Sequence, residues 1–174
     1  MVMCARLLGA SASCTSPFAL CGHDSGSLCC YDLRINNGQA LLTMNLHKEP
    51  VLCVDMDSSC KHGVSGSADS AMHMFKLNLK EASCQVRHTF HSESPGTSCV
   101  EIRPDEKLLT AGGWDRRLRI FSWRDPRPLA ILRCHEESVY CVDYSPQVGV
   151  FAAGSKDNRI SIWNVYPEEQ ILDR

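Results

Sequence analysis

The sequence predicts an all-β protein, a partial β-propeller of about three and a half to four blades whose ring is not closed. The first observation is a repeat of glycines, each followed nine residues later by an aromatic residue. They stand at Gly22, Gly66, Gly112 and Gly154, at spacings of 44, 46 and 42 residues. That period suits a blade of four antiparallel strands, which takes about 40–45 residues. The second observation is the alternation of apolar and polar residues within each copy, as in Ile160–Trp163, which is typical of strands.

One domain accounts for the chain, because 174 residues suit a single repeat array. We predict a partial propeller over residues 1–174, with approximate repeats at 1–46, 47–90, 91–134 and 135–166, and a C-terminal tail at 167–174. Only eleven residues follow Trp163, so the last blade is expected to lack its outermost strand. An open arc exposes apolar faces and unpaired strand edges. We therefore expect a fragment or a truncated isoform that is unstable or aggregates in isolation.

A second set of positions recurs inside the last three copies. An aspartate follows each glycine by three residues, and a histidine precedes each aspartate by 22 or 24 residues. The repeat positions are His47, Asp69, His91, Asp115, His135 and Asp157, with Trp163 at the end of the last copy. We predict one His–Asp hydrogen bond per blade, which would link the loop before the blade to a turn within it. Three copies at one period indicate architecture rather than a catalytic dyad. The first copy departs from this pattern, because Ser25 stands at the position of the aspartate.

Composition limits the classes of partner. The net charge is −2, so the chain lacks the basic excess typical of nucleic-acid binding. No apolar run approaches the roughly 18 residues that a bilayer span needs, so no membrane partner is expected. Met1–Ser13 is interpreted as a buried strand rather than a signal peptide, because Arg6 interrupts its apolar run. The 11 cysteines are odd in number and scattered, which favours reduced thiols and a cytoplasmic or nuclear location, or both.

Candidate chemical sites are weak. Cys21, His23, Cys29 and Cys30 crowd one segment, but their spacing does not match a metal site and a strand would alternate their directions. His62–Gly66 faintly resembles a nucleophile elbow, but Ser67 stands where that motif needs glycine. No phosphate-binding glycine loop is present. We therefore expect no enzyme activity, no catalytic residue, no cofactor and no metal.

An excess of arginine marks residues 113–133, which hold six arginines against two aspartates. The candidate docking residues are Arg116, Arg117, Arg119 and Arg124, with Arg127 and Arg133 nearby. Guanidinium groups pair well with carboxylates and phosphates, so the segment could dock an acidic or phosphorylated partner. The alternative is a solvated outer face of a blade. The sequence leaves both open.

The repeated pattern resembles the WD-repeat family. The residues that carry the resemblance are Ala111–Asp115, Ala152–Ser161 and Tyr31-Asp32, a substitute for the Trp-Asp pair. More specifically, nearly the whole chain is similar to the C-terminal half of G-protein β-like members of the family. The resemblance implies a non-enzymatic scaffold or adaptor for protein–protein interaction. It also implies a link to the co-chaperone machinery that matures PI3-kinase-related kinases, and to DNA-damage signalling.

Two further expectations concern partners. True G-protein β subunits hold a γ subunit through a coiled-coil helix, and no heptad pattern is present, so no γ subunit is expected. Tyr31-Asp32-Leu33-Arg34 resembles the aromatic-Asp-x-Arg box with which some WD-repeat proteins dock on cullin ubiquitin ligases. The alternative function is therefore a substrate receptor of such a ligase, with Tyr31, Asp32 and Arg34 as its box.

Overall fold

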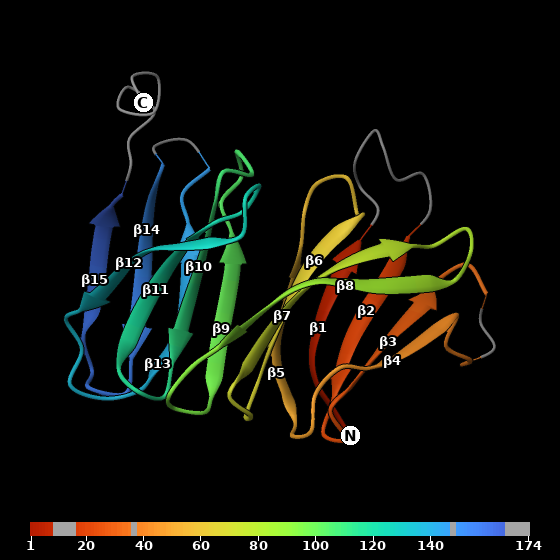
Figure 1. Ribbon diagram of the computed structural model, residues 1–174, viewed down its shortest axis with the longest axis horizontal. Coiled ribbons are helices and arrows are strands. Elements are labelled where there is room, and N and C mark those ends of the chain that lie inside the picture. Colours follow the sequence, from red (N-terminus) through yellow and green to blue (C-terminus); the bar gives the residue numbers. More distant parts are fainter. Residues whose placement is uncertain (9–16, 36–37, 147–148, 166–174) are drawn as a thin grey trace.

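The computed structural model describes residues 1–8, 17–35, 38–146 and 149–165, and within them it holds fifteen strands in four antiparallel sheets (Figure 1). The strands are β1 (Val2–Leu8), β2 (Phe18–His23), β3 (Ser27–Asp32), β4 (Leu42–Asn45), β5 (Val51–Met56), β6 (His62–Ser67), β7 (Ala71–Asn78), β8 (Ser83–His91), β9 (Thr97–Ile102), β10 (Leu108–Gly113), β11 (Arg117–Ser122), β12 (Arg127–Arg133), β13 (Val139–Tyr144), β14 (Val150–Ser155) and β15 (Ile160–Asn164).

Each sheet is a meander, in which strands pair in chain order. The first three sheets have four strands each, β1 to β4, β5 to β8 and β9 to β12, and the fourth has β13 to β15 among the described residues. We call them blades 1 to 4. The innermost strands β1, β5, β9 and β13 lie beside one another, while the outer strands fan apart. The prediction of a partial propeller with three and a half to four blades is confirmed. The expected tail at 167–174 lies outside the described residues.

The core lies between blades rather than within them, because neighbouring sheets pack face to face and the two middle sheets bury both faces. One cluster packs Leu20 and Leu28 of blade 1 against Val51 and Phe75 of blade 2. A second cluster joins blades 2 and 3, and a third joins blades 3 and 4. Burial of apolar area at these three junctions supplies the main driving force for folding. A blade at either end of the arc has only one neighbour.

A close approach between neighbouring blades explains the repeated glycine. A Cβ atom on Gly22 would lie 2.6 Å from Cγ1 of Val51, the first residue of the next blade. Gly66 stands in the same relation to Thr97, and Gly112 to Val139. Any side chain at these glycines would push the next blade away. The period read from the sequence therefore marks the junctions between blades.

One expectation about the N-terminal segment is wrong. We interpreted Met1–Ser13 as a buried strand, and β1 is a strand, but most of its side chains are exposed. Residues 9–16 lie outside the described part. The equivalent strand of blade 2, β5, is mostly buried because blade 1 covers it. No other sheet of the described residues covers the corresponding face of blade 1, so tertiary context rather than the local sequence decides the burial of β1.

The junctions predict a contrast between two glycine substitutions. In Gly112→Ala the new methyl group would meet Val139 Cγ1 at 2.7 Å and Cys99 Sγ at 2.6 Å, so we expect a loss of about 1–3 kcal/mol in the free energy of unfolding. The matched control is Gly154→Ala, whose methyl group would meet only Cys141 Sγ of its own blade. The free energy of unfolding of that variant should stay within about 0.5 kcal/mol of the wild-type value. Urea unfolding measures both, and equal losses would contradict the account.

Candidate functional site

Two of the predicted histidine–aspartate pairs form. In blade 2, His47 Nδ1 lies 3.1 Å from Asp69 Oδ2, and His47 Nε2 lies 2.9 Å from Ser65 Oγ. In blade 4, His135 Nδ1 lies 3.0 Å from Asp157 Oδ2. Both imidazoles are buried. Each pair links the loop that enters its blade to the turn between the second and third strands, as the sequence predicted.

The network in blade 4 is the more extended of the two. His135 Nε2 contacts Ser161 Oγ at 2.9 Å, and Trp163 Nε1 donates to the same oxygen at 2.8 Å. Burial acts to raise the pKa of Asp157, but hydrogen bonds from the Glu136 amide and the His135 side chain outweigh it and lower the pKa to about 2. Asp157 therefore stays ionised, and the residues that resemble a catalytic dyad hold the blade together.

The third predicted pair, His91 with Asp115, does not form among the described residues. Arg119 takes the place of the histidine, with Nη1 and Nη2 lying 3.1 and 2.5 Å from the two oxygens of Asp115. His91 is exposed instead. The cause is the loop before blade 3, which is two residues longer and turns at Gly96 with φ 90° beneath the Trp114 ring.

These contacts predict that two histidines at equivalent repeat positions contribute differently to the free energy of unfolding. His135→Ala removes one hydrogen-bond partner from the buried Asp157 side chain and one from the partly buried Ser161, so we expect a loss of about 1–3 kcal/mol in the free energy of unfolding. His91→Ala is the matched control and should change it by less than about 0.5 kcal/mol. Urea unfolding distinguishes the two variants. A large loss from the His91 change would contradict the arrangement.

A second polar network joins the innermost strands, and the sequence analysis missed its role. Asp55 on β5 accepts the backbone amide of Ile102 on β9 at 2.8 Å, and Arg6 on β1 contacts the same carboxylate at 2.9 Å. Glu101 on β9 accepts the backbone amide of Tyr144 on β13 in the same way. The signal was present, because an acidic residue follows each repeated Cys-Val pair. Asp55 and Glu101 therefore each connect their own blade to the next one.

The junction at Glu101 predicts a dependence of stability on pH. Burial, with a contribution from the charges of Asp143 and Asp55, raises the pKa of Glu101 from 4.5 to about 7. The folded state therefore binds this proton more tightly than the unfolded state. The resulting stabilisation is complete below pH 4.5 and is lost as the pH rises through about 7.

Glu101→Gln tests this expectation, because glutamine stays neutral and still accepts the Tyr144 amide. The free energy of unfolding of the variant, relative to the wild type, should rise by about 1–2 kcal/mol as the pH goes from 4.5 to 8. This energy is set below the full value of the pKa shift because the carboxylate is partly exposed. Urea unfolding at a series of pH values measures the difference. A difference that does not change with pH would contradict it.

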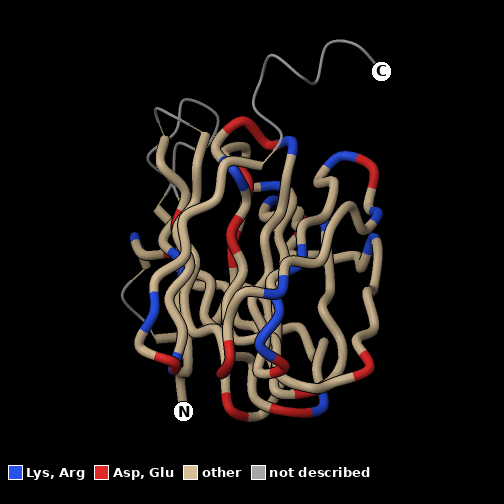
Figure 2. Tube along the Cα trace, turned by 90° about the vertical axis from the view of Figure 1, so that its left-hand side faces the viewer, with Lys and Arg blue, Asp and Glu red and all other residues tan. Residues whose placement is uncertain are grey.

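The arginines of residues 113–133 do not form one patch. Arg116 lies in the turn before β11, and Arg124 in the turn after it, so the length of β11 separates them, roughly 3.3 Å per residue. Arg117 lies 3.9 Å from Asp115, and Arg119 is bound to the same carboxylate. Figure 2 shows acidic and basic residues interspersed along the loops at the edge near the N-terminus. Only Arg116 and Arg117 therefore remain together as docking candidates.

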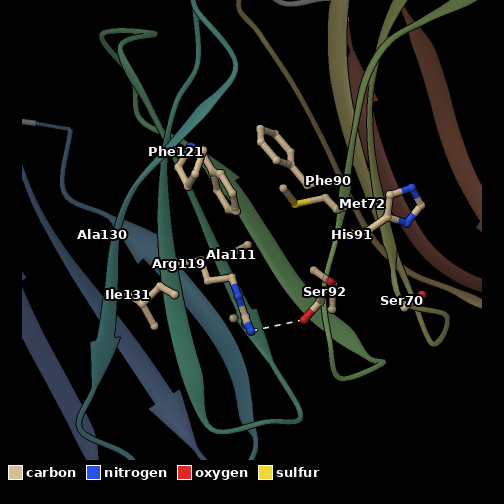
Figure 3. Close-up of a pocket in the computed structure, with 13 residues that line it drawn as sticks. Ser70, Met72, Phe90, His91, Ser92, Ala111, Arg119, Phe121, Ala130 and Ile131 are labelled. Atoms are coloured by element: carbon tan, nitrogen blue, oxygen red, sulfur yellow. Dashed lines mark hydrogen bonds between the residues drawn. The ribbon is translucent and has the colours of Figure 1, made fainter.

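A groove between blades 2 and 3 is a feature that sequence reasoning did not find. It has a volume of about 210 Å³, and one end is apolar, with Met72, Phe90 and Phe121 facing one another (Figure 3). The rings of Phe90 and Phe121 lie 4.4 Å apart. At the other end, Arg119 donates to Ser92 at 3.2 Å. The volume is below the roughly 300–1,000 Å³ of most small-molecule sites, so it suits a side chain of a partner protein.

The predicted ligase box lies at the end of β3. Arg34 Nε contacts Asp32 Oδ1 at 2.9 Å, and the Arg34 guanidinium lies 5.9 Å from the centre of the Phe18 ring. Hydrogen bonds from the Arg34 side chain and amide lower the pKa of Asp32 to about 2. The arginine is exposed but folded back on its own aspartate, while Leu33 beside it is exposed.

The described residues hold no group of histidine, cysteine and acidic side chains arranged to bind a metal ion. The ten described cysteines are all free thiols, and five of them are buried. Burial raises the pKa of Cys99 to about 12, so that thiol stays protonated. In the described part of the chain, no helix has the length and apolar character needed to cross a lipid bilayer.

Blades built on repeated histidine, aspartate and glycine positions define a WD-repeat β-propeller, and the chain belongs to the WD-repeat family. The family model described as WD domain, G-beta repeat matches residues 38–76, 83–122 and 126–164. Proteins of this family bind other proteins and generally serve as scaffolds. The sequence-based recognition of the family is confirmed.

Among individual proteins, the chain is similar to guanine nucleotide-binding protein subunit beta-like protein 1 of Mus musculus. The two are 41% identical over 96% of this chain and 50% of that protein. It is also similar to ASTRA-associated protein 1 of Schizosaccharomyces japonicus, 33% identical over 74% of this chain and 35% of the relative. The Schizosaccharomyces pombe protein of the same name is 30% identical over 69% of this chain and 33% of that protein. The chain spans half the length of the mouse relative and about a third of the yeast ones.

Proposed function

We propose that this chain is a non-enzymatic scaffold that joins other proteins into a complex. The observation that carries the proposal is the similarity to a G-protein β-like protein over 96% of the chain. The polar residues of the repeat are consistent with it. His47, His135 and Asp157 are hydrogen-bonded within their own blades, so their polar groups serve the architecture of the repeat.

The groove between blades 2 and 3 is the proposed contact for a partner protein. It combines the apolar end described above with the hydrogen-bonding groups of Arg119 and Ser92, and Ile131, the strand partner of Arg119, is half exposed along its wall. Buried apolar anchors supply most of the energy at protein interfaces. The exposed Arg116 of the neighbouring turn and the partly buried Arg117 at the start of β11 add positive charge for an acidic or phosphorylated segment.

The partners that we propose are the co-chaperone machinery and the PI3-kinase-related kinases that it matures, in DNA-damage signalling. Support comes from the family resemblance and from two similar proteins whose names describe association with ASTRA. We also propose that the chain acts in the cytoplasm, the nucleus or both, since free thiols persist in reducing compartments.

Affinity purification of the tagged chain from cells, followed by mass spectrometry, tests the proposal. We expect co-chaperone subunits and large kinases to be enriched, and Ile131→Asp to reduce their recovery because a charge replaces a half-exposed apolar side chain that lines the groove. Val86→Asp is the matched control, since Val86 is 42% exposed and Ile131 50%, but Val86 lies outside the groove. Recovery no greater than with an unrelated propeller would contradict the proposed partners.

The same experiment separates the alternative function, a substrate receptor of a cullin ubiquitin ligase. The exposed Leu33 and Arg34 at the end of β3 favour it, because both are accessible to an adaptor. Capture of a cullin and its adaptor by the wild type, and their loss in Arg34→Ala, would support this alternative. Capture unaffected by the Arg34 change would exclude the box as the contact.

A further inference from the structure

Two arginines lie opposite each other on the outer strands of blade 3. Arg117 of β11 and Arg133 of β12 are direct partners in the strand pairing. Side chains in such a pair start about 4.5–5.5 Å apart, and like charges placed there destabilise a sheet. The strand pairing therefore adds Arg133 to the docking candidate Arg117, at a cost to the stability of the blade. We call these two residues the arginine pair.

The repeat does not require two positive charges at this place. In each blade the first member of the corresponding pair stands two residues after the position of the repeated aspartate. In blade 1 the pair is Ser27 with Asn45, and in blade 2 it is Ala71 with His91. Blades 1 and 2 thus form the same pairing of strands without opposed cations. The arginine pair is a property of blade 3 and not of the architecture.

The charge of the arginine pair is largely uncompensated. Arg133 is exposed and forms no ion pair within the described part of the chain. Arg117 lies 3.9 Å from Asp115, but that carboxylate is bound more closely by Arg119, at 2.5 Å. Glu93, exposed in the loop after β8, pairs with neither arginine. An anion from outside the described chain would therefore find two guanidinium groups available together.

The arginine pair continues the groove between blades 2 and 3. Alternate residues of a strand point to the same side, so Arg117, Arg119 and Phe121 line one side of β11. Arg119 reaches Ser92 of blade 2 from that side (Figure 3). From Arg117 to Phe121 the strand advances by roughly 13 Å, at about 3.3 Å per residue. An extended segment of a partner would cross from the charged end to the apolar end in about four residues.

We propose that the groove binds an extended segment of a partner protein that carries a phosphoserine or phosphothreonine on the arginine pair and an apolar side chain between Phe90 and Phe121. The inference rests on the proposed partner contact in the groove and names its chemistry. A phosphate group carries close to two negative charges and three acceptor oxygens, so it can bridge two guanidinium groups. A carboxylate brings one charge and matches a single guanidinium.

A pool of synthetic peptides tests the site. The peptides have a fixed central phosphoserine and random flanking residues, and they are passed over the immobilised 174-residue chain. Parallel pools carry serine or glutamate at the centre. The phosphoserine pool should be retained about tenfold better than either, because charge-assisted hydrogen bonds are the stronger ones. The retained peptides should be enriched in leucine, methionine or phenylalanine about four residues from the phosphoserine. Equal retention of the serine or the glutamate pool would overturn the proposal.

Arg133→Ala should abolish the preference for the phosphoserine pool, and Arg133→Lys should restore part of it. Arg124→Ala is the matched control, because it removes an exposed arginine of the same blade at the other end of β11. The urea midpoint of Arg133→Ala should equal or exceed that of the wild type, since one of two opposed charges is removed. A lower midpoint would give the arginine pair a structural role, and an equal loss of retention in Arg124→Ala would make the effect one of general charge. Either result would overturn the site.

Phosphatase treatment of the cell lysate separates this inference from the proposed function. Before the affinity purification described above, the treatment should remove the partners whose recovery depends on Ile131. Partners that are lost in Ile131→Asp but persist after phosphatase treatment and in Arg133→Ala would uphold the scaffold and overturn the phosphate site.

Discussion

The close approach of neighbouring blades at a glycine is the constraint on which the rest of this structure depends. Because Gly22, Gly66 and Gly112 have no side chain, the first residue of the next blade can lie directly on the second strand. That contact sets the distance between sheets, and the apolar clusters then fill the space on either side. A propeller is a repetition of this one junction, and its stability is close to a sum over junctions.

Two polar networks support the same junctions, and together they use most of the repeated polar residues. The His47 and His135 networks tie loops to turns within a blade, and the carboxylates of Asp55 and Glu101 accept amides from the next blade. Since these groups are already bound to one another, they are unsuited to recognise a ligand. Recognition is left to residues that differ from one blade to the next.

Blade 3 shows where such differences arise. A loop two residues longer displaces His91, and Arg119 binds Asp115 in its place. His91 also lines the groove, in which Phe90 and Phe121 face one another at one end and Arg119 contacts Ser92 at the other. The departure from the repeat therefore lies at the feature best suited to a partner. This agrees with a scaffold whose blades are uniform in architecture and individual in their surfaces.

The sequence by itself determined the repeat, the class of fold and the histidine–aspartate pairs of blades 2 and 4, because each depends on positions that recur at one period. Only the tertiary structure decided what depends on neighbouring blades. It decided the exposure of β1, the separation of Arg116 from Arg124, and the groove. The physical reason is that a strand's alternation specifies its two faces but not whether another sheet covers them.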